Sequence, residues 1–143
     1  MIDEQAQTLS AYRMSKANAV LVQAELLLKN HQYDGSINRS YYAMLTAVRA
    51  LLALVRLDSR SHQGVISFFD RYFVKTSLLE KQYSQFLHAA FDARQDNDYE
   101  DFYIPSARDA QEQYDHACQL LQEIEQKCQL FLEEKLTLPT ISS

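Results

Sequence analysis

Apolar side chains recur along this chain in steps of three and four residues, the period at which an α-helix presents one face to its neighbours. The longest run lies near the C-terminus, at Ala107, Ala110, Tyr114, Ala117, Leu121, Ile124, Cys128 and Phe131. Shorter runs occupy Met14, Ala17, Leu21, Ala24 and Leu28, and then Tyr41, Leu45, Val48, Leu52 and Val55. We infer that long amphipathic helices make up most of the chain.

The pattern predicts helices over residues 3–30, 35–57, 62–73, 78–94 and 107–135. Asp34, Ser59 or Ser61, and Ser106 stand where an N-cap side chain would accept the free amide hydrogens of a first turn. Residues 95–105 show no helical period, are acidic and aromatic, and end at a proline, so we expect a loop there.

Turn-forming residues are scarce, with two glycines and two prolines in 143 residues. An all-β fold with many hairpins is therefore excluded, and long helices with few connections are favoured. We predict an all-α fold: an antiparallel up-and-down bundle of four long helices plus one short helix. The domain is expected to span residues 1–135, followed by a C-terminal tail at 136–143.

Charge and cysteine content narrow the function classes. The net charge of −5 disfavours a broad, non-specific nucleic-acid-binding surface but allows a local basic site. Cys118 and Cys128 are ten residues apart in one predicted helix, about 15 Å along its axis, so we expect free thiols. The most apolar run, about 14 residues at 44–57, is interrupted by Arg49 and Arg56 and is too short to span a bilayer. We expect a cytoplasmic protein without membrane association.

Several catalytic classes lack their sequence motifs here. There is no glycine-rich phosphate loop, nucleophile elbow or His-Glu-x-x-His zinc pattern. The acidic segment 96–98 lacks the glycine and the final glutamate of a calcium loop, and the glutamates do not form a di-iron motif. We therefore expect no metal site and no cofactor.

A set of polar residues remains at helix positions that should be partly buried: Asn38, Arg39, Tyr42, Thr46, His62, Arg94, Asp98 and Tyr99. Three segments carry most of them, at residues 38–52 (NRSYYAMLTAVRALL), 61–65 (SHQGV) and 94–99 (RQDNDY). Together, and in this order, they resemble the stand-alone prokaryotic branch of the HEPN superfamily (higher eukaryotes and prokaryotes nucleotide-binding domain). The resemblance extends over about residues 9–125.

The resemblance implies a helical bundle that forms homodimers and that is often paired with a small nucleotidyltransferase in a toxin–antitoxin system. Members with an arginine followed closely by a histidine are metal-independent endoribonucleases. In such a site the histidine serves as general acid or base and the arginine stabilises the phosphate charge. Here Arg39 matches, but Thr46 stands where relatives carry the histidine. A threonine is a poor proton shuttle, so His62 becomes the candidate imidazole.

Three hypotheses follow. The first is a module that binds a nucleotide or an RNA phosphate at the polar set. The second is an endoribonuclease toxin that uses Arg39 and His62 as catalytic residues. The third is a structural dimerisation module in which these residues serve only the fold. The structural interpretations are that Arg39 pairs with Asp98, that His62 stacks on Phe69 or Tyr99, and that Arg94 pairs with Asp98 at i,i+4.

Overall fold

The computed structural model describes residues 2–142, and within this range the chain forms helices and no strand. The helices are α1 (Glu4–Lys29), α2 (Tyr33–Ala53), α3 (His62–Phe69), the π-helical segment η1 (Asp70–Val74), α4 (Lys81–Tyr99) and α5 (Ala107–Leu132). The all-α prediction of four long helices and one short helix is confirmed. None of these helices combines the length and apolarity needed to cross a bilayer.

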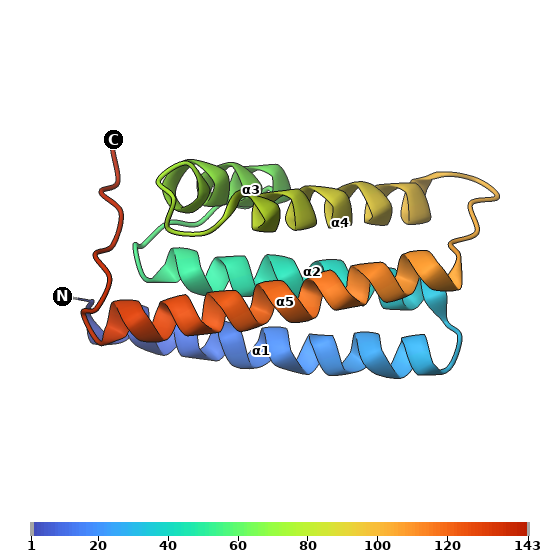
Figure 1. Ribbon diagram of the computed structural model, residues 1–143, viewed down its shortest axis with the longest axis horizontal. Coiled ribbons are helices and arrows are strands. Elements are labelled where there is room, and N and C mark those ends of the chain that lie inside the picture. Colours follow the sequence, from blue (N-terminus) through green and yellow to red (C-terminus); the bar gives the residue numbers. More distant parts are fainter. Residues whose placement is uncertain (1, 143) are drawn as a thin grey trace.

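Helix α2 is the centre of the bundle. The long helices α1, α2, α4 and α5 run in alternating directions, and α3 crosses one end of the bundle (Figure 1). Helix α2 packs against each of the other α-helices, and 13 of its 21 residues are buried. The predicted stripe from Tyr41 to Leu52 lies in this core. Any polar side chain on α2 is therefore close to a neighbouring helix.

Side-chain caps fix three of the helix starts. Asp3, Ser61 and Ser106 accept from the backbone amides of Ala6, Gly64 and Asp109 at 2.8, 2.9 and 3.0 Å. The caps predicted at Ser61 and Ser106 are confirmed.

The cap predicted at Asp34 is wrong, because α2 begins earlier and Gln32 holds the N-cap position. Asp34 lies in the first turn and accepts from the amide of Gly35 at 2.8 Å.

Further helix boundaries differ from the prediction, including the ends of α2 and α4. Helix α2 stops at Ala53, and Arg56 then adopts a left-handed conformation with φ 58°. Helix α4 continues to Tyr99, so the loop predicted from residue 95 is wrong for its first five residues. These residues are polar and show no apolar period. An Arg94–Asp98 ion pair and a hydrogen bond from Asn97 to the carbonyl of Asp34 at 2.9 Å hold them in the helix.

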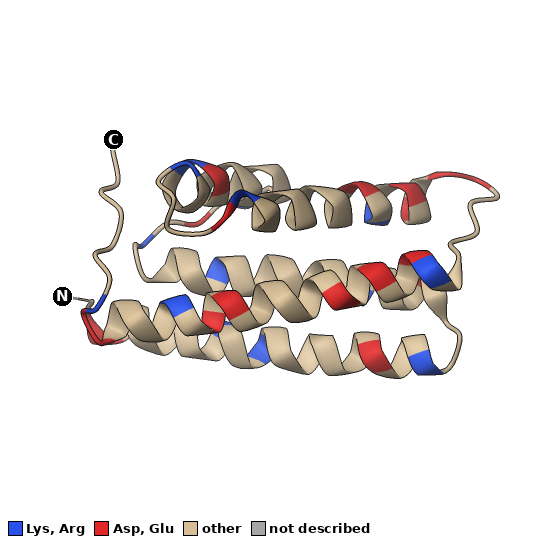
Figure 2. Cartoon of the chain, viewed as in Figure 1, with Lys and Arg blue, Asp and Glu red and all other residues tan. Residues whose placement is uncertain are grey.

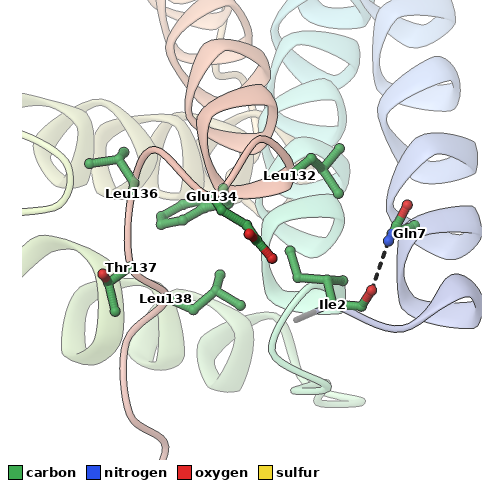
Figure 3. Close-up of a pocket in the computed structure, with 8 residues that line it drawn as sticks. Ile2, Gln7, Leu132, Glu134, Leu136, Thr137 and Leu138 are labelled. Atoms are coloured by element: carbon green, nitrogen blue, oxygen red, sulfur yellow. Dashed lines mark hydrogen bonds between the residues drawn. The ribbon is translucent and has the colours of Figure 1, made fainter.

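The two ends of the chain meet at one end of the bundle. Ile2 and the residues that follow α5 line a hollow of about 340 Å³ (Figure 3). The side chain of Gln7 donates to the carbonyl of Ile2 at 2.7 Å across its edge. Leu136 and Leu138, which line this hollow, and Ile141 are half-buried against the core. Both cysteines are free, and burial raises the pKa of the Cys128 thiol to about 11.

Candidate functional site

Adjacent tyrosines on α2 form the floor of the candidate site. Consecutive helical residues diverge by about 100°, so Tyr41 enters the core while Tyr42 turns toward α4. Tyr41 is fully buried, and its hydroxyl shares a 2.9 Å hydrogen bond with Nδ1 of His62. Burial raises the pKa of the Tyr41 hydroxyl well above its usual value, so this group keeps its proton at neutral pH.

His62 is the first residue of α3 and lies over both tyrosines. Its ring centroid is 5.7 Å from that of Tyr41 and 5.8 Å from that of Tyr42. The pKa of the imidazole is lowered, first by burial and then by the positive charges of Arg94 and Arg49. We therefore expect a neutral imidazole at pH 7, with Nδ1 committed to Tyr41.

The start of α3 depends on a close backbone approach at Gly64. A Cβ atom at this position would clash with the side chain of Ser59 in the preceding loop. The amide of Gly64 also donates to the Ser61 cap. Glycine thus lets the loop fold tightly onto the first turn of α3, which carries His62.

Arg94 joins α4 to α2 through aromatic rings. Its guanidinium carbon lies 5.9, 5.6 and 5.8 Å from the ring centroids of Tyr41, Tyr42 and Tyr99. Nη2 donates to the Tyr42 hydroxyl at 3.1 Å. Nε lies 2.8 Å from Oδ2 of Asp98, an ion-pair distance, although the N–H is not aimed at the oxygen. The predicted Arg94–Asp98 pair is confirmed.

Arg39 also lies against the ring of Tyr42, and its charge has no acidic partner among residues 2–142. Its guanidinium carbon is 5.2 Å from the Tyr42 centroid, and Nη2 donates to Oδ1 of Asn38 at 2.9 Å. Within residues 2–142 no carboxylate lies at ion-pair distance from it. The interpretation that Arg39 pairs with Asp98 is wrong, because Asp98 pairs with Arg94.

Seven of the eight predicted residues form one connected cluster through these contacts: Asn38, Arg39, Tyr42, His62, Arg94, Asp98 and Tyr99. Thr46, half-buried one turn along α2, takes no part in these contacts. Tyr99 falls in the predicted loop but is the last residue of α4, with 70% of its surface exposed. The expected stacking of His62 on Phe69 or Tyr99 is replaced by its contacts with Tyr41 and Tyr42.

Two residues of the site, Tyr41 and Arg49, are missing from the set predicted from the sequence. Tyr41 fits the apolar stripe of its helix. The one indication of a further role in the sequence is its hydroxyl, because a buried hydroxyl needs a hydrogen-bond partner. Arg49 resembles a member of a solvated charged face in the sequence. It is half-buried and donates to the carbonyl of Ser59 at 2.9 Å, which ties the loop before α3 to α2.

Comparison with known protein families identifies the chain. The model of the HEPN domain matches residues 10–127, which is most of the sequence and includes the entire cluster. This chain belongs to the HEPN family.

Curated relatives of this HEPN chain are short archaeal and bacterial proteins. A UPF0332 protein of Thermotoga maritima is 39% identical over 88 residues, 62% of this chain and 67% of that protein. A UPF0332 protein of Pyrococcus horikoshii is 43% identical over 75 residues, 52% and 53% of the two chains. A protein of Methanocaldococcus jannaschii that carries the name "putative toxin" is 32% identical over 87 residues, 61% and 59%. The alignments thus span between about half and two thirds of these relatives.

The HEPN cluster holds two arginines, of which Arg94 is paired with Asp98 and Arg39 with no carboxylate among residues 2–142, in a chain of net charge −5. Acidic positions follow the end of α4 into the next loop (Figure 2), yet of these only Asp98 pairs with a cluster arginine. The cluster offers guanidinium N–H donors, an aromatic face and a neutral imidazole, and both arginines and the imidazole lie against the Tyr42 ring. These groups suit a phosphate with an attached base or sugar better than they suit a metal ion.

Proposed function

We propose that this HEPN chain binds the phosphate of a nucleotide or of RNA at Arg39, beside His62 and Arg94. The observation that carries the proposal is the state of the Arg39 guanidinium. It is bonded only to a neutral amide, lies against the ring of Tyr42, and has no acidic partner among the described residues. A guanidinium in this state keeps most of its five N–H donors for an incoming anion.

The neighbouring groups add specificity to such a site. The exposed Tyr99 presents an aromatic ring on which a base can stack, a contact worth about 1–3 kcal/mol per base. Arg94 is already paired with Asp98. It would therefore help to orient the ligand and add to the local electric field, but it would not supply an unpaired charge. A phosphate placed at Arg39 would therefore lie beside aromatic surface, as in a single-stranded RNA site.

The biological setting that we propose is a toxin–antitoxin type system with a small nucleotidyltransferase as partner. Relatives in Methanocaldococcus jannaschii carry the name "putative toxin" and align over more than half of this chain. The nucleotidyltransferase partner rests on the family resemblance of the three sequence segments.

Binding of a labelled, short single-stranded RNA, measured by fluorescence anisotropy, tests the proposal. We expect Arg39→Met to weaken binding about tenfold or more, because a charge-assisted hydrogen bond to phosphate is lost. The matched control is Arg71→Met, which removes an exposed arginine of η1 outside the cluster. Equal affinity of the wild type and Arg39→Met would overturn the proposal and favour the structural-module hypothesis. Thermal shifts with ATP and with inorganic phosphate would separate nucleotide from simple anion binding.

A second candidate function is metal-independent RNA cleavage. The observation that favours it is the neutral imidazole of His62, held by Tyr41 beside two arginines. In this reaction Nε2 of His62, with Nδ1–H donating to the Tyr41 oxygen, would take the proton of a ribose 2′-hydroxyl. The 2′-oxygen would attack the phosphorus, and the bond from phosphorus to the 5′-oxygen would break as that oxygen takes a proton from solvent water. Arg39 would stabilise the charge on the phosphate. Thr46, in place of the family's histidine, keeps this candidate second.

Incubation of RNA with the protein in EDTA distinguishes the two functions. The enzyme hypothesis predicts products with 2′,3′-cyclic phosphate ends, lost in both Arg39→Ala and His62→Ala. RNA that is bound but left intact by the wild type would support the binding function alone.

A further inference from the structure

The loop that joins α4 to α5 leaves an aromatic side chain in solvent. Phe102 is 99% exposed, more than any other large hydrophobic residue in the described range 2–142, and Ile104 of the same loop is 87% exposed. Apolar surface in water is unfavourable, and an aromatic ring carries a large amount of it. A ligand that covers the Phe102 ring would therefore gain free energy that the fold leaves unused.

The backbone at Phe102 is strained. Its φ of 63° lies in the left-handed region, which a bulky side chain seldom adopts. Two hydrogen bonds hold the turn around it: the amide of Glu100 donates to the carbonyl of Asp96 at 3.2 Å, and the amide of Tyr103 donates to the carbonyl of Glu100 at 3.4 Å. Strained residues of this kind cluster at active sites and ligand-binding loops. An exposed ring on such a backbone is better explained by a contact outside the fold than by a role in the fold.

The loop starts at the cluster around Arg39. Tyr99, the last residue of α4, belongs to that cluster, and Asn97 donates to the carbonyl of Asp34 at 2.9 Å. This end of α4 therefore lies beside the start of α2, and the loop leaves the bundle at the same end (Figure 1). Phe102 follows Tyr99 by three residues, at most about 10 Å of chain. A ligand anchored at Arg39 and extending past Tyr99 thus comes within reach of Phe102.

Charge determines which part of a ligand the loop accepts. Glu100 and Asp101 precede the ring and are both exposed. They repel a phosphate, whereas the Arg39 guanidinium is bonded only to a neutral amide and attracts one. A nucleobase is planar, aromatic and uncharged, so it can stack on the ring without repulsion from these carboxylates. The arrangement favours a ligand with its phosphate at Arg39 and its base at the loop.

We propose that Phe102 is the base-binding residue of this site and stacks on the nucleobase of a nucleotide or of single-stranded RNA. The inference rests on the proposed phosphate site at Arg39 and adds a contact that distinguishes a nucleotide from a sugar phosphate. The exposed Tyr99 ring lies at the start of the same loop and provides neighbouring aromatic surface. Every base has an aromatic face, so we expect little preference among the four bases.

Displacement of the labelled RNA by two small competitors tests the proposal. AMP and ribose 5-phosphate share the sugar phosphate, and only AMP carries a base. AMP should displace the RNA from the wild type at the lower concentration, and Phe102→Ala should reduce this preference about tenfold. Phe102→Tyr keeps an aromatic ring and should retain the preference. Ile104→Ala, at an exposed apolar residue without a ring, is the matched control and should retain it too.

Two results of this competition would overturn the proposal. One is a wild type that shows no preference for AMP, and the other is a Phe102→Ala variant with the wild-type preference. Either result would leave the Phe102 ring as a candidate contact for a partner protein.

Fluorescence gives a second measurement, because the chain contains no tryptophan. In Phe102→Trp, unlabelled RNA and AMP should quench the indole emission by stacking, and ribose 5-phosphate should not. Tyr12→Trp is the control and should keep its emission, because α1 makes no contact with α4 among the described residues. If anisotropy shows bound RNA while the emission of Phe102→Trp is unchanged, then the base contact is wrong and the phosphate site remains. If the wild type binds no RNA, then both are wrong.

Discussion

The two arginines of α2 are in opposite states although they share one helix. Arg49, near its C-terminal end, donates to the carbonyl of Ser59 and lies 3.8 Å from Asp58. Arg39, near the start, is bonded only to Asn38 and the face of Tyr42. Both are half-buried, so burial does not distinguish them. Their partners do: Arg49 is bonded to the loop before α3, whereas Arg39 is bonded to a neutral amide and has no acidic partner among the described residues.

The difference follows from what surrounds each end of α2. At the Arg49 end, Arg13 donates to the Arg49 carbonyl and to Asp58, both at 3.1 Å, so α1, α2 and the loop before α3 form one network. At the Arg39 end, Asp98 is the acidic residue of the cluster, and it is already paired with Arg94. Arg39 is therefore left without a counter-charge, and its guanidinium contributes little to the stability of the fold.

The largest stability effect is expected for Arg94→Met, which removes the cation that joins α4 to α2. Its side chain is only 16% exposed and that of Asp98 is 30% exposed. Loss of the ion pair and of the contacts with three rings should lower the free energy of unfolding by about 2–3 kcal/mol. Urea denaturation measures it. If Arg94→Met is as stable as the wild type, then the cluster does not hold α4 in place.

The period of apolar residues was enough to predict the helices, but not how far α4 extends. Positions 95–99 carry no apolar side chain that enters the core, so the apolar period ends before the helix does. The Arg94–Asp98 pair was predictable because residues four apart share a helix face. The bond between Tyr41 and His62 was not. It joins positions 21 apart, and it depends on the path of the loop that Arg49 and Gly64 fix.

A smaller loss, about 1–2 kcal/mol, is expected for Arg49→Met, since its partner Asp58 is 54% exposed. Arg39→Met is the matched comparison on the same helix and should change the free energy of unfolding by about 0.5 kcal/mol or less. Both variants keep the aliphatic stem, so the difference reports on partners alone. Equal losses in the two variants would remove the distinction between a structural and a ligand-facing arginine.

The smallest effect is expected for the pH dependence of stability that His62 causes. This imidazole is subject to the charge of Arg94, which contacts α2 near Arg39, and to that of Arg49 near the other end of α2. Burial and the charges of Arg94 and Arg49 lower the pKa of the folded imidazole below its unfolded value of about 6.5. Below pH 6.5 the unfolded chain therefore binds a proton that the folded chain does not. Stability should fall as pH drops from about 6.5 to the folded pKa, by at most about 1.4 kcal/mol per pH unit.

Urea midpoints between neutral and mildly acidic pH measure this slope. His62→Gln should flatten it, because the variant lacks the imidazole whose pKa is lowered in the folded chain. Arg49→Met should flatten it in part, because one of the two charges that oppose protonation is gone, and Arg39→Met should not. A slope that persists in His62→Gln would mean that the imidazole titrates freely. Neutral His62 would then be no part of the candidate site, and the Arg39 end of α2 would contain an anion site without a proton acceptor.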